Sequence, residues 1–457
     1  MWCEVNVLKM DFLENSDRPN SMDAGIKEER LPRAIWVLVA AAVAIALGYG
    51  IVAPVLPQYA KSFSVTNLAA TFVVSAFALL RLSFAPASGW LSTKFGERRM
   101  YLFGIAIVMI SSFASAFAQS YLQLLIFRAA GGIGSVTFSV AAMSMIFKLA
   151  PPTMRGRASA AYGAGFLIGN IAGPAVGALL SGLGYRWPFF IYGCFLIIAW
   201  LIVKIAIGPD VFLPAKSPLP PEKSTVDSES ASDSAAAVPE KSEKAAKAAK
   251  AAKAANHSAR PVITVREALQ LRRFRITLLT AFSQGWTNMG VRVSVIPLLA
   301  LSLPTAAPWL AGGLLTTFAF GNALALWVAG KWSDLSGRRH PVIFGLLLSG
   351  FFTLGMGIFT ADWVLLLLSF WGGFGSGCIQ PSQQGAVADI IGDRSGNSVV
   401  SFFQMAGDFG QIIGPLVAGF LIDISGFTLA YWISGGILLL AALFWIFDGQ
   451  RHEKIVD

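Results

Sequence analysis

Four ionisable side chains stand inside long apolar runs of the sequence, where a charge is expensive. Arg81, Arg128 and Arg292 each interrupt such a run, and Asp408 lies within "SFFQMAGDFGQIIGPLVAGFLID" (401–423). Within a bilayer such groups are rare and usually mark a substrate, ion or proton pathway. A carboxylate takes up and releases protons, so Asp408 is the candidate for proton coupling. Arg128 and Arg292 are candidates for a cavity lining or for proton transfer.

Other kinds of chemistry lack the residues that they need. The histidines His257, His340 and His452 all lie in polar segments, which excludes a histidine proton relay within the bilayer. The three cysteines have neither metal nor disulfide spacing. The sequence holds no nucleophile–base constellation and no GxxxxGK[ST] phosphate loop. We therefore expect no enzyme, no metal and no cofactor, with a proton gradient as the energy source.

Twelve apolar segments position these charges. The 457-residue chain is 55% hydrophobic and only 13% charged, whereas a soluble protein carries about 25% charged residues. Each segment is close to the ~20 residues that cross a bilayer. The sequence predicts an all-α membrane protein with twelve transmembrane helices and no nucleic-acid partner. The segments lie at about 34–56, 69–91, 100–118, 121–147, 158–182, 187–207, 275–303, 306–330, 341–360, 363–388, 397–423 and 427–447.

The polar stretches divide the chain into five expected parts. These are an N-terminal tail (1–33), a six-helix half (34–207), a central loop (208–273), a second six-helix half (274–448) and a C-terminal tail (449–457). The central loop contains "KSEKAAKAAKAAKAANH", which favours helix by propensity. A solvated linker and a segment that touches anionic lipid both fit this composition.

The short loops predict the orientation in the cell membrane. Ten lysines and arginines fall in the loops after spans 2, 4, 8 and 10, against Lys61 and Arg186 on the other side. By the positive-inside rule, both termini and the central loop are expected in the cytoplasm. The ten are Lys94, Arg98, Arg99, Lys148, Arg155, Arg157, Lys331, Arg338, Arg339 and Arg394.

The two halves repeat each other in one register. "GWLSTKFGERR" begins at Gly89 and "GKWSDLSGRRH" at Gly330, an offset of 241. "GGIGS" recurs as "GGFGS", and "GNIAGPAVG" as "GQIIGPLVA", at the same offset. This pattern is typical of transporters built from two parallel six-helix repeats that rock around a midplane site.

These motifs resemble those of the major facilitator superfamily, and within it the twelve-span drug:proton antiporter group. The loop after span 2 is similar to the signature G-x-L-x-D-x-x-G-R-K/R, although Thr93 stands at its acidic position and Glu97 at a basic one. The resemblance implies a cytoplasmic gate at these loops. The gate residues are Gly89, Gly96, Arg98 and Arg99 in the first copy and Gly330, Asp334, Gly337, Arg338 and Arg339 in the second.

Three more segments carry the resemblance. "LLIFRAAGGIG" is similar to the arginine motif of span 4, in which Arg128 is the arginine. "LGYGIVAPVLP" is similar to the first-helix motif of the antiporter group. "GNIAGPAVGALL" is similar to the antiporter motif, which implies a helix bend and a coupling role, with close helix packing as the alternative. Its residues are Gly169, Gly173, Pro174 and Gly177, and the repeat copy adds Gly414 and Pro415.

Spans 2 and 11 pack across the boundary between halves in this superfamily, so the resemblance brings Arg81 near Asp408. Both lie roughly 15 Å from the cytoplasmic ends of their spans at 1.5 Å per residue. The hypothesis is an inter-half ion pair that protonation of Asp408 breaks. A static structural pair or a hydrogen-bonded helix kink is the alternative. The repeat equivalent of Asp408 is Leu167, so the acid belongs to one half only.

Three cations within the spans against one acid suggest a net-positive cavity, which favours a carboxylate-bearing substrate. For Arg128, hydrogen bonds to backbone carbonyls are the alternative to a cavity role; for Arg292 the alternative is snorkelling. Six polar residues are candidate lining, with helix–helix hydrogen bonding as the other interpretation: Gln284, Trp286, Asn288, Asn322, Gln380 and Gln384.

The leading expectation is a proton-coupled secondary transporter that exports drugs or small metabolites by alternating access, as a monomer in the lipid bilayer. A transporter of an organic anion, in either direction, is the second. A non-transporting membrane sensor on the same scaffold is an alternative from another class.

Overall fold

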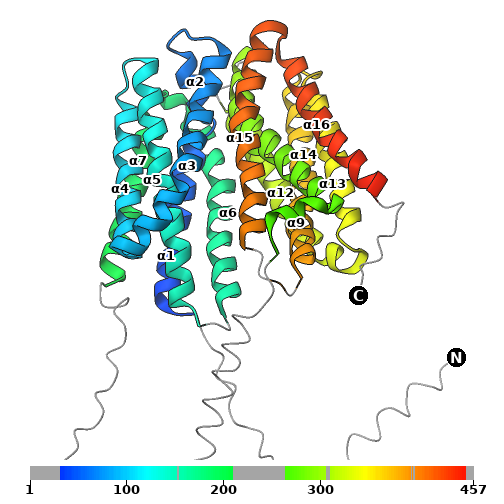
Figure 1. The fold of residues 1–457 in the computed structure, drawn as a ribbon. Helices are drawn as coiled ribbons and strands as arrows, with labels where there is room; N and C mark the ends of the chain where they lie inside the picture. The colour runs from blue at the N-terminus through cyan, green and yellow to red at the C-terminus, as the bar shows by residue number, and fades with distance from the viewer. Residues whose placement is uncertain are drawn as a thin grey trace, which may run out of the picture.

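The chain forms two groups of six spanning helices in the computed structural model (Figure 1). The structure describes residues 31–208 except 152–153, and residues 263–448 except 305–308, 393 and 395–396. All secondary structure within these ranges is helical. Nearly all of the N-terminal tail, most of the central loop and the C-terminal tail lie outside the described residues.

The N-terminal half consists of six spanning helices and two short ones. Apolar and small residues fill the spans, and side chains cap α3 and α5, where Thr66 and Ser120 accept from backbone N–H groups of the first turn. The helices are α1 (Arg33–Val52), α2 (Leu56–Lys61), α3 (Asn67–Phe95), α4 (Glu97–Ala116), α5 (Tyr121–Leu149), α6 (Arg155–Leu180), η2 (Ser181–Leu183) and α7 (Trp187–Ala206).

The C-terminal half repeats this plan with one broken span. Residues 265–270 and 272–273, assigned above to the central loop, are helical, and α9 begins at a capping box made by Thr264 and Glu267. The helices are α9 (Val265–Gln270), α10 (Arg272–Gln284), the π-helix η4 (Gly285–Val291), α11 (Arg292–Ser302), α12 (Leu310–Ser336), α13 (Arg339–Met356), α14 (Asp362–Ile391), α15 (Asn397–Ser425) and α16 (Phe427–Asp448).

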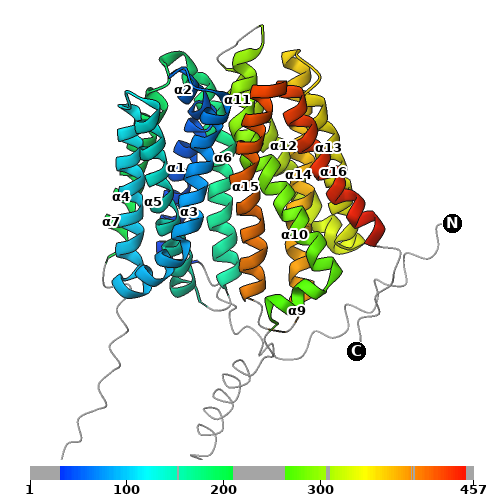
Figure 2. The same ribbon diagram turned by 45° about the horizontal axis from the view of Figure 1, so that its top comes forward.

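Eleven helices in the described residues are long and apolar enough to cross a membrane. The twelfth expected span, at 275–303, is the consecutive run of α10, η4 and α11 (Figure 2). Each of its three pieces is shorter than a bilayer requires, but together they run from residue 272 to 302. The expected twelve-span architecture is thus present with one span in three segments.

The repeat register of 241 recurs in the packing. In the first half, Gly104 of α4 and Gly134 of α5 face each other so closely that a Cβ on Gly134 would lie 2.6 Å from the Gly104 carbonyl oxygen. In the second half, a Cβ on Gly375 would lie 2.7 Å from the carbonyl oxygen of Gly345. Both positions are 241 residues on from their counterparts. The duplicated glycines therefore make the same helix contact in both halves.

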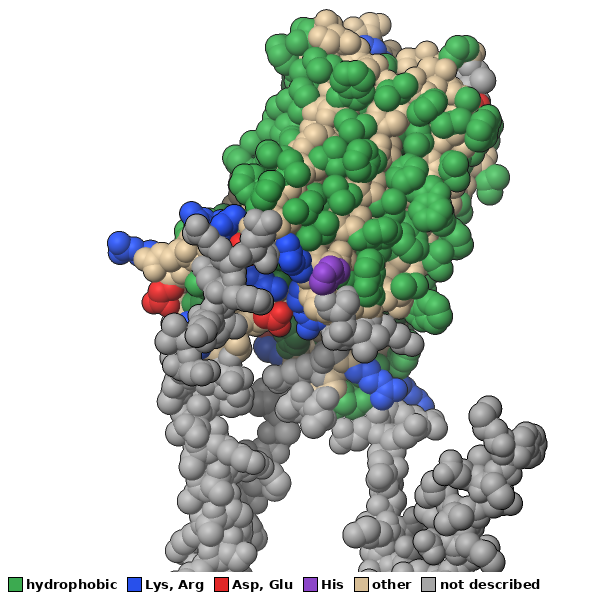
Figure 3. Space-filling view, turned by 90° about the vertical axis from the view of Figure 1, so that its right-hand side faces the viewer, with side chains coloured by type: hydrophobic (Ala, Val, Ile, Leu, Met, Phe, Trp, Pro, Cys, Tyr) green, Lys and Arg blue, Asp and Glu red, His purple; other side chains and the backbone are tan. Residues whose placement is uncertain are grey.

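The halves meet along two repeat-related seams. Helix α3 packs on α15, and α6 packs on α12. We call the end of the bundle at which α1 begins and α16 ends the terminal face, and the end that carries α2 the opposite face (Figure 1). A belt of apolar side chains covers the bundle on the side shown in Figure 3, and basic side chains gather toward the terminal face. The chain is a multi-pass membrane protein.

Candidate functional site

The opposite face is closed by hydrogen bonds between the halves. The Asp423 carboxylate of α15 accepts from the backbone N–H groups of Asn67 and Leu68, both at 2.9 Å, and from the Asn67 amide at 2.8 Å. These are the first N–H groups of α3, which have no partner within their own helix. On the same face, the Gln58 amide donates to the Pro297 carbonyl at 3.1 Å. Sequence reasoning missed Asp423, because it sits at a helix end where acids are ordinary.

The hydrogen bonds between α3 and α15 extend from the opposite face inward to Ser75. Its hydroxyl donates to the Ile412 carbonyl of α15 at 2.7 Å. Between fully described residues, each inter-half hydrogen bond lies at this contact or nearer the opposite face. Among the fully described residues, the hydrogen bonds between the halves are thus concentrated on one side of the bundle.

Arg81 and Asp408 lie on the terminal side of the Ser75 contact, on the two helices of the same seam. They are near enough to interact electrostatically, but no nitrogen–oxygen pair between these two described residues is within the 4 Å of an ion pair. Arg81 is exposed and Asp408 is half-buried. The arrangement places a carboxylate and a cation on the two helices of one inter-half seam, within electrostatic reach of each other but without a direct ion pair.

Arg128 lies deep in the N-terminal half, at the edge of a small cavity between the halves. Its side chain is 1% exposed, and its Nε and Nη1 atoms have no hydrogen-bond partner. The guanidinium stacks over the Phe77 ring at 5.0 Å and lies 5.9 Å from the Phe189 ring. Residues from α1, α2, α3, α5, α11 and α15 line the cavity: Tyr49, Val52, Ala53, Leu56, Val74, Phe77, Arg128, Val293 and Gln411.

An uncompensated buried cation costs several kcal/mol in a low-dielectric interior. Aromatic faces offset part of this cost, since each cation–π contact contributes about 0.5–2 kcal/mol. The free N–H groups of Arg128 remain suited to a carboxylate, which guanidinium groups bind with two parallel hydrogen bonds. Gln411 adds an amide to the same cavity.

Three of the polar residues predicted as lining form a network in the C-terminal half. Ser376 of α14 is its centre: it accepts from the Asn288 amide at 2.7 Å and the Asn322 amide at 3.3 Å, and donates to Gln284 at 3.1 Å. Asn288 also donates to Gln284. The sequence singled out the amides but missed Ser376, because a serine in a membrane helix usually bonds to its own backbone.

The other predicted lining residues lie elsewhere. The Trp286 indole donates to the Ser434 hydroxyl at 3.1 Å and is buried within the C-terminal half. Gln380 and Gln384 of α14 are exposed. The site residues predicted from the span sequences thus divide among an inter-half cavity, a hydrogen-bonded network and the core of one half.

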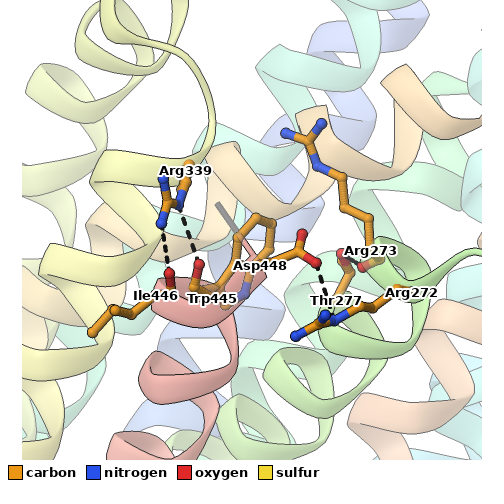
Figure 4. Close-up of polar contacts among 7 residues, drawn as sticks. All are labelled: Arg272, Arg273, Thr277, Arg339, Trp445, Ile446 and Asp448. Carbon is orange, nitrogen blue, oxygen red and sulfur yellow. Dashed lines mark hydrogen bonds and ion pairs between the residues drawn. The ribbon is translucent and has the colours of Figure 1, made fainter. Parts of the chain in front are cut away.

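The loop arginines hold helix ends within each half. Arg98 donates to the carbonyls of Ile207 at 2.5 Å and Lys204 at 2.9 Å, at the end of α7. Its repeat equivalent, Arg339, donates to the carbonyls of Trp445 at 3.2 Å and Ile446 at 2.7 Å, at the end of α16 (Figure 4). Cations there satisfy carbonyls that lack helical partners and complement the helix dipole.

Two glycines of these loops allow the backbone to turn between consecutive helices. Gly96 and Gly337 are repeat equivalents with φ of 87° and 79°, which only glycine adopts readily, and each ends a long helix. A Cβ on Gly89 would meet nothing within 4 Å. Arg99 is exposed. The surroundings of Gly330 and the side chain of Asp334 lie outside the described part of the structure.

Glu97, which departs from the loop signature, is explained by its partner. It forms an ion pair with Lys148 of α5 at 2.5 Å. In the repeat register these positions are Arg338 and Asp389, which pair at 3.5 Å. The two halves therefore hold the same inter-helix ion pair with the charges exchanged.

The antiporter-motif glycines bring helices into close contact. On α6, Gly169, Gly173 and Gly177 pack against α1, and a Cβ on Gly173 would lie 2.6 Å from the Gly50 Cα atom. On α15, Gly414 and Pro415 pack against the π-helix η4. Pro174 and Pro415 lie within their helices, where each removes one backbone hydrogen bond.

Known proteins share this sequence pattern and this fold. The sequence is 23% identical over 431 residues to the quinolone resistance protein NorA of Staphylococcus aureus, covering 93% of this chain and 98% of that one. It is 35% identical over 121 residues to multidrug resistance protein 3 of Bacillus subtilis, covering 26% and 24% of the two chains.

Solved structures show the same architecture. A bacterial homologue of the human lysosomal transporter Spinster superposes with a TM-score of 0.67 at 16% identity, covering 92% of this chain and 96% of that one. A D-xylose–proton symporter gives 0.64 at 17% (90% and 96%), and the human organic anion transporter MFSD10 (TETRAN) gives 0.59 at 19% (90% and 99%). The family pattern of the Major Facilitator Superfamily matches residues 38–314 and 277–456. The chain therefore belongs to the Major Facilitator Superfamily and is a secondary transporter, not an enzyme.

Proposed function

We propose that this transporter couples proton movement to the export of small organic molecules by alternating access. The observation that carries the proposal is the position of Asp408, the acid inside the apolar spans, beside Arg81 at the seam between halves. Proton binding there changes the charge at the place where the halves must approach and part. The carboxylate is only half-buried, which leaves part of the Asp408 side chain accessible for proton exchange.

The hydrogen bonds at the opposite face support the alternating-access part of the proposal. Opening that face requires Asp423 to release the first turn of α3, and Ser75 to release the Ile412 carbonyl. Closing the terminal side brings Arg81 and Asp408 together, which favours the ionised carboxylate by direct attraction. Protonation removes that attraction and so favours separation of the halves at this level.

The orientation follows from charge. In the described residues, Lys94, Arg98, Arg99 and Lys148 all lie at helix ends at the terminal face, and Figure 3 shows basic side chains toward that end. The positive-inside rule then assigns the terminal face to the cytoplasm of the cell membrane. In this orientation the described conformation is closed to the outside.

Two substrate classes have support. The similarity to NorA and to multidrug resistance protein 3 favours drugs or drug-like metabolites. The unpartnered guanidinium of Arg128 at the inter-half cavity favours a substrate that carries a carboxylate, and one structural neighbour is described as an organic anion transporter. A drug that carries a carboxylate satisfies both observations.

Transport into proteoliposomes under an imposed pH gradient tests the proposal. We expect gradient-driven movement of a cationic dye or of carboxylates from a panel. Asp408→Asn is expected to abolish the dependence of this transport on the pH gradient. Asp448→Asn, which changes an acid outside the seam, is the matched control and is expected to keep that dependence. Carboxylate transport lost in Arg128→Lys, which keeps the charge but not the planar fork, assigns the anion. Gradient-dependent transport that persists in Asp408→Asn would refute the coupling role.

A further inference from the structure

The arginines of the C-terminal half fall into two groups by exposure. Arg292 of α11 is 4% exposed, and its guanidinium stacks over the Phe318 ring of α12 at 3.4 Å. It therefore stays in the core of one half and does not reach a membrane surface. Arg266 of α9 and Arg275 of α10 are exposed instead. The second group can meet a partner outside the chain.

Helix α9 precedes the seventh span without being part of it. Figures 1 and 2 place α9 at the terminal face. Between α9 and α10 the backbone at Leu271 is extended, with φ of −74° and ψ of 119°. The helical path is thus broken at this residue, and α9 does not prolong the span across the bilayer.

One side of α9 packs on the bundle. Ala268 is fully buried, and so are Ile263 before it and Phe274 after it. These three side chains cluster with Val387 of α14 and Val399 of α15. The packing determines which side of α9 faces away from the protein.

The other side of α9 combines leucine with arginine. Arg266 and Leu269 lie three residues apart and so share a helix face. Leu269 is 36% exposed, and Leu271, at the corner before α10, is 38% exposed. Leucine side chains are stabilised by leaving water. At a bilayer surface they can enter the headgroup region beside arginines whose guanidinium groups stay at the phosphates.

Three arginines of this segment have no carboxylate beside them. Arg272 pairs with Asp448 at 3.3 Å, whereas Figure 4 shows the Arg273 guanidinium pointing away from that pair. Between fully described residues, no carboxylate oxygen lies within 4 Å of Arg266, Arg273 or Arg275. The segment therefore presents three cations that the described protein does not neutralise.

The acids closest in sequence or packing already have partners. The Glu267 carboxylate accepts from the backbone N–H of Thr264 in the capping box. Asp389, near the end of the helix α14 on which α9 packs, pairs with Arg338. The charge of the exposed side is thus positive, which is complementary to an anionic surface.

We propose that α9 and the first turn of α10 form a contact surface for anionic phospholipid. Arg266, Arg273 and Arg275 bind the headgroup phosphates, and Leu269 and Leu271 enter the bilayer interface. Because the other side of α9 packs on α15, bound lipid steadies the terminal end of that seam helix. The assignment to the cytoplasmic leaflet rests on the orientation proposed above, whereas the lipid contact itself does not.

A fluorophore on α9 tests this surface. Gln270 is exposed on α9, so a cysteine there, in a chain without its three native cysteines, can carry an environment-sensitive dye. The labelled full chain is placed in nanodiscs of phosphatidylcholine, either alone or mixed with phosphatidylglycerol. We expect a blue shift of the emission with phosphatidylglycerol. The shift should weaken as salt is added, because ions screen exposed charges.

The Arg266→Gln/Arg273→Gln/Arg275→Gln variant is expected to lose the shift, since each arginine near an anionic surface contributes about a fivefold factor in affinity. An unchanged Tm in phosphatidylcholine is expected to show that this variant folds. Arg394→Gln is the matched control and should keep the shift. Arg394 is exposed at the same face, but its side chain already donates to two backbone carbonyls at the end of α14.

Four results would each overturn the proposal. They are equal emission in the two lipid mixtures, a full shift in the triple variant, an equal loss in Arg394→Gln, and the same shift produced by soluble glycerol phosphate in phosphatidylcholine nanodiscs. The last result would indicate a site for a free anion. None of these measurements depends on proton coupling through Asp408, so the lipid surface and the proposed transport function can fail separately.

Discussion

Replacing Asp423 by alanine is expected to open the opposite face. The change removes three hydrogen bonds of 2.8–2.9 Å that join α15 to the first turn of α3. It leaves the Thr66 cap of α3 in place, since that side chain serves a different N–H group, that of Ala69. The perturbation therefore acts on the contact between halves more than on the helix itself.

The magnitude follows from the geometry. Losing an N-terminal helix cap costs about 0.5–2 kcal/mol, and hydrogen bonds to an ionised group lie at the upper end of the usual range. The contact is exposed to solvent, which screens the charge and lowers its contribution. We therefore expect about 1–2 kcal/mol, which changes the ratio of closed to open opposite face roughly 5–30-fold.

Distances between two spin labels measure this ratio. Gln119 and Thr360 are exposed repeat equivalents on the opposite face, one in each half. Labelled cysteines at these positions, in a chain without its three native cysteines, are expected to show a second, longer distance in Asp423→Ala. The population at the longer distance should be smaller in Asp423→Asn than in Asp423→Ala, because the asparagine amide oxygen still accepts hydrogen bonds from the first turn of α3.

Asp448→Ala supplies the control, since this acid pairs with Arg272 inside the C-terminal half at 3.3 Å (Figure 4). It is expected to leave the distances unchanged. Identical distributions in the unaltered chain and in Asp423→Ala would show that the hydrogen bonds do not hold the face closed, and the same shift in Asp448→Ala would show a non-specific effect.

Three further outcomes are expected from thermal unfolding. Glu97→Lys should destabilise by about 1 kcal/mol through like-charge contact with Lys148, and adding Lys148→Glu should restore Tm; no recovery would contradict the pairing. Gly132→Ala should prevent correct packing, since its Cβ would lie 2.3 Å from a carbonyl oxygen of α3, whereas Gly163→Ala, with nothing within 4 Å, should be tolerated. Arg98→Gln should lower Tm by loosening the end of α7, and an unchanged Tm would show that its two hydrogen bonds contribute nothing.

The spans and the repeat could be predicted because the sequence shows apolar runs of the required length and motifs that recur at a fixed offset. A bilayer needs about 20 apolar residues per helix, and the glycines at the 241 register mark equivalent contacts. Arg81 and Asp408 lie within electrostatic reach of each other, as expected. Their role in proton coupling stays a prediction. The break of the seventh span into a π-helix at Gly285–Val291 was not foreseen, because that stretch contains no proline to mark it.

The partners of single polar residues could not be predicted from the sequence. Glu97 was noted as a departure from the signature, but its pairing with Lys148 depends on how α4 and α5 approach each other. Asp423 and Ser75 were overlooked, because a terminal acid and a helical serine carry no local signal of an inter-half contact. Long-range contacts of this kind are fixed by tertiary packing rather than by residue type.

The exchanged ion pairs distinguish the helices of one half from their equivalents in the other while the chain assembles. A duplicated chain risks pairing a helix of one half with the partner of its equivalent. Here, α4 placed against α14 would set Glu97 against Asp389, and α13 or its loop placed against α5 would set Arg338 against Lys148. Both mismatches are repulsive, so the polarity of one ion pair discriminates against exchanged halves while the correct contacts stay attractive.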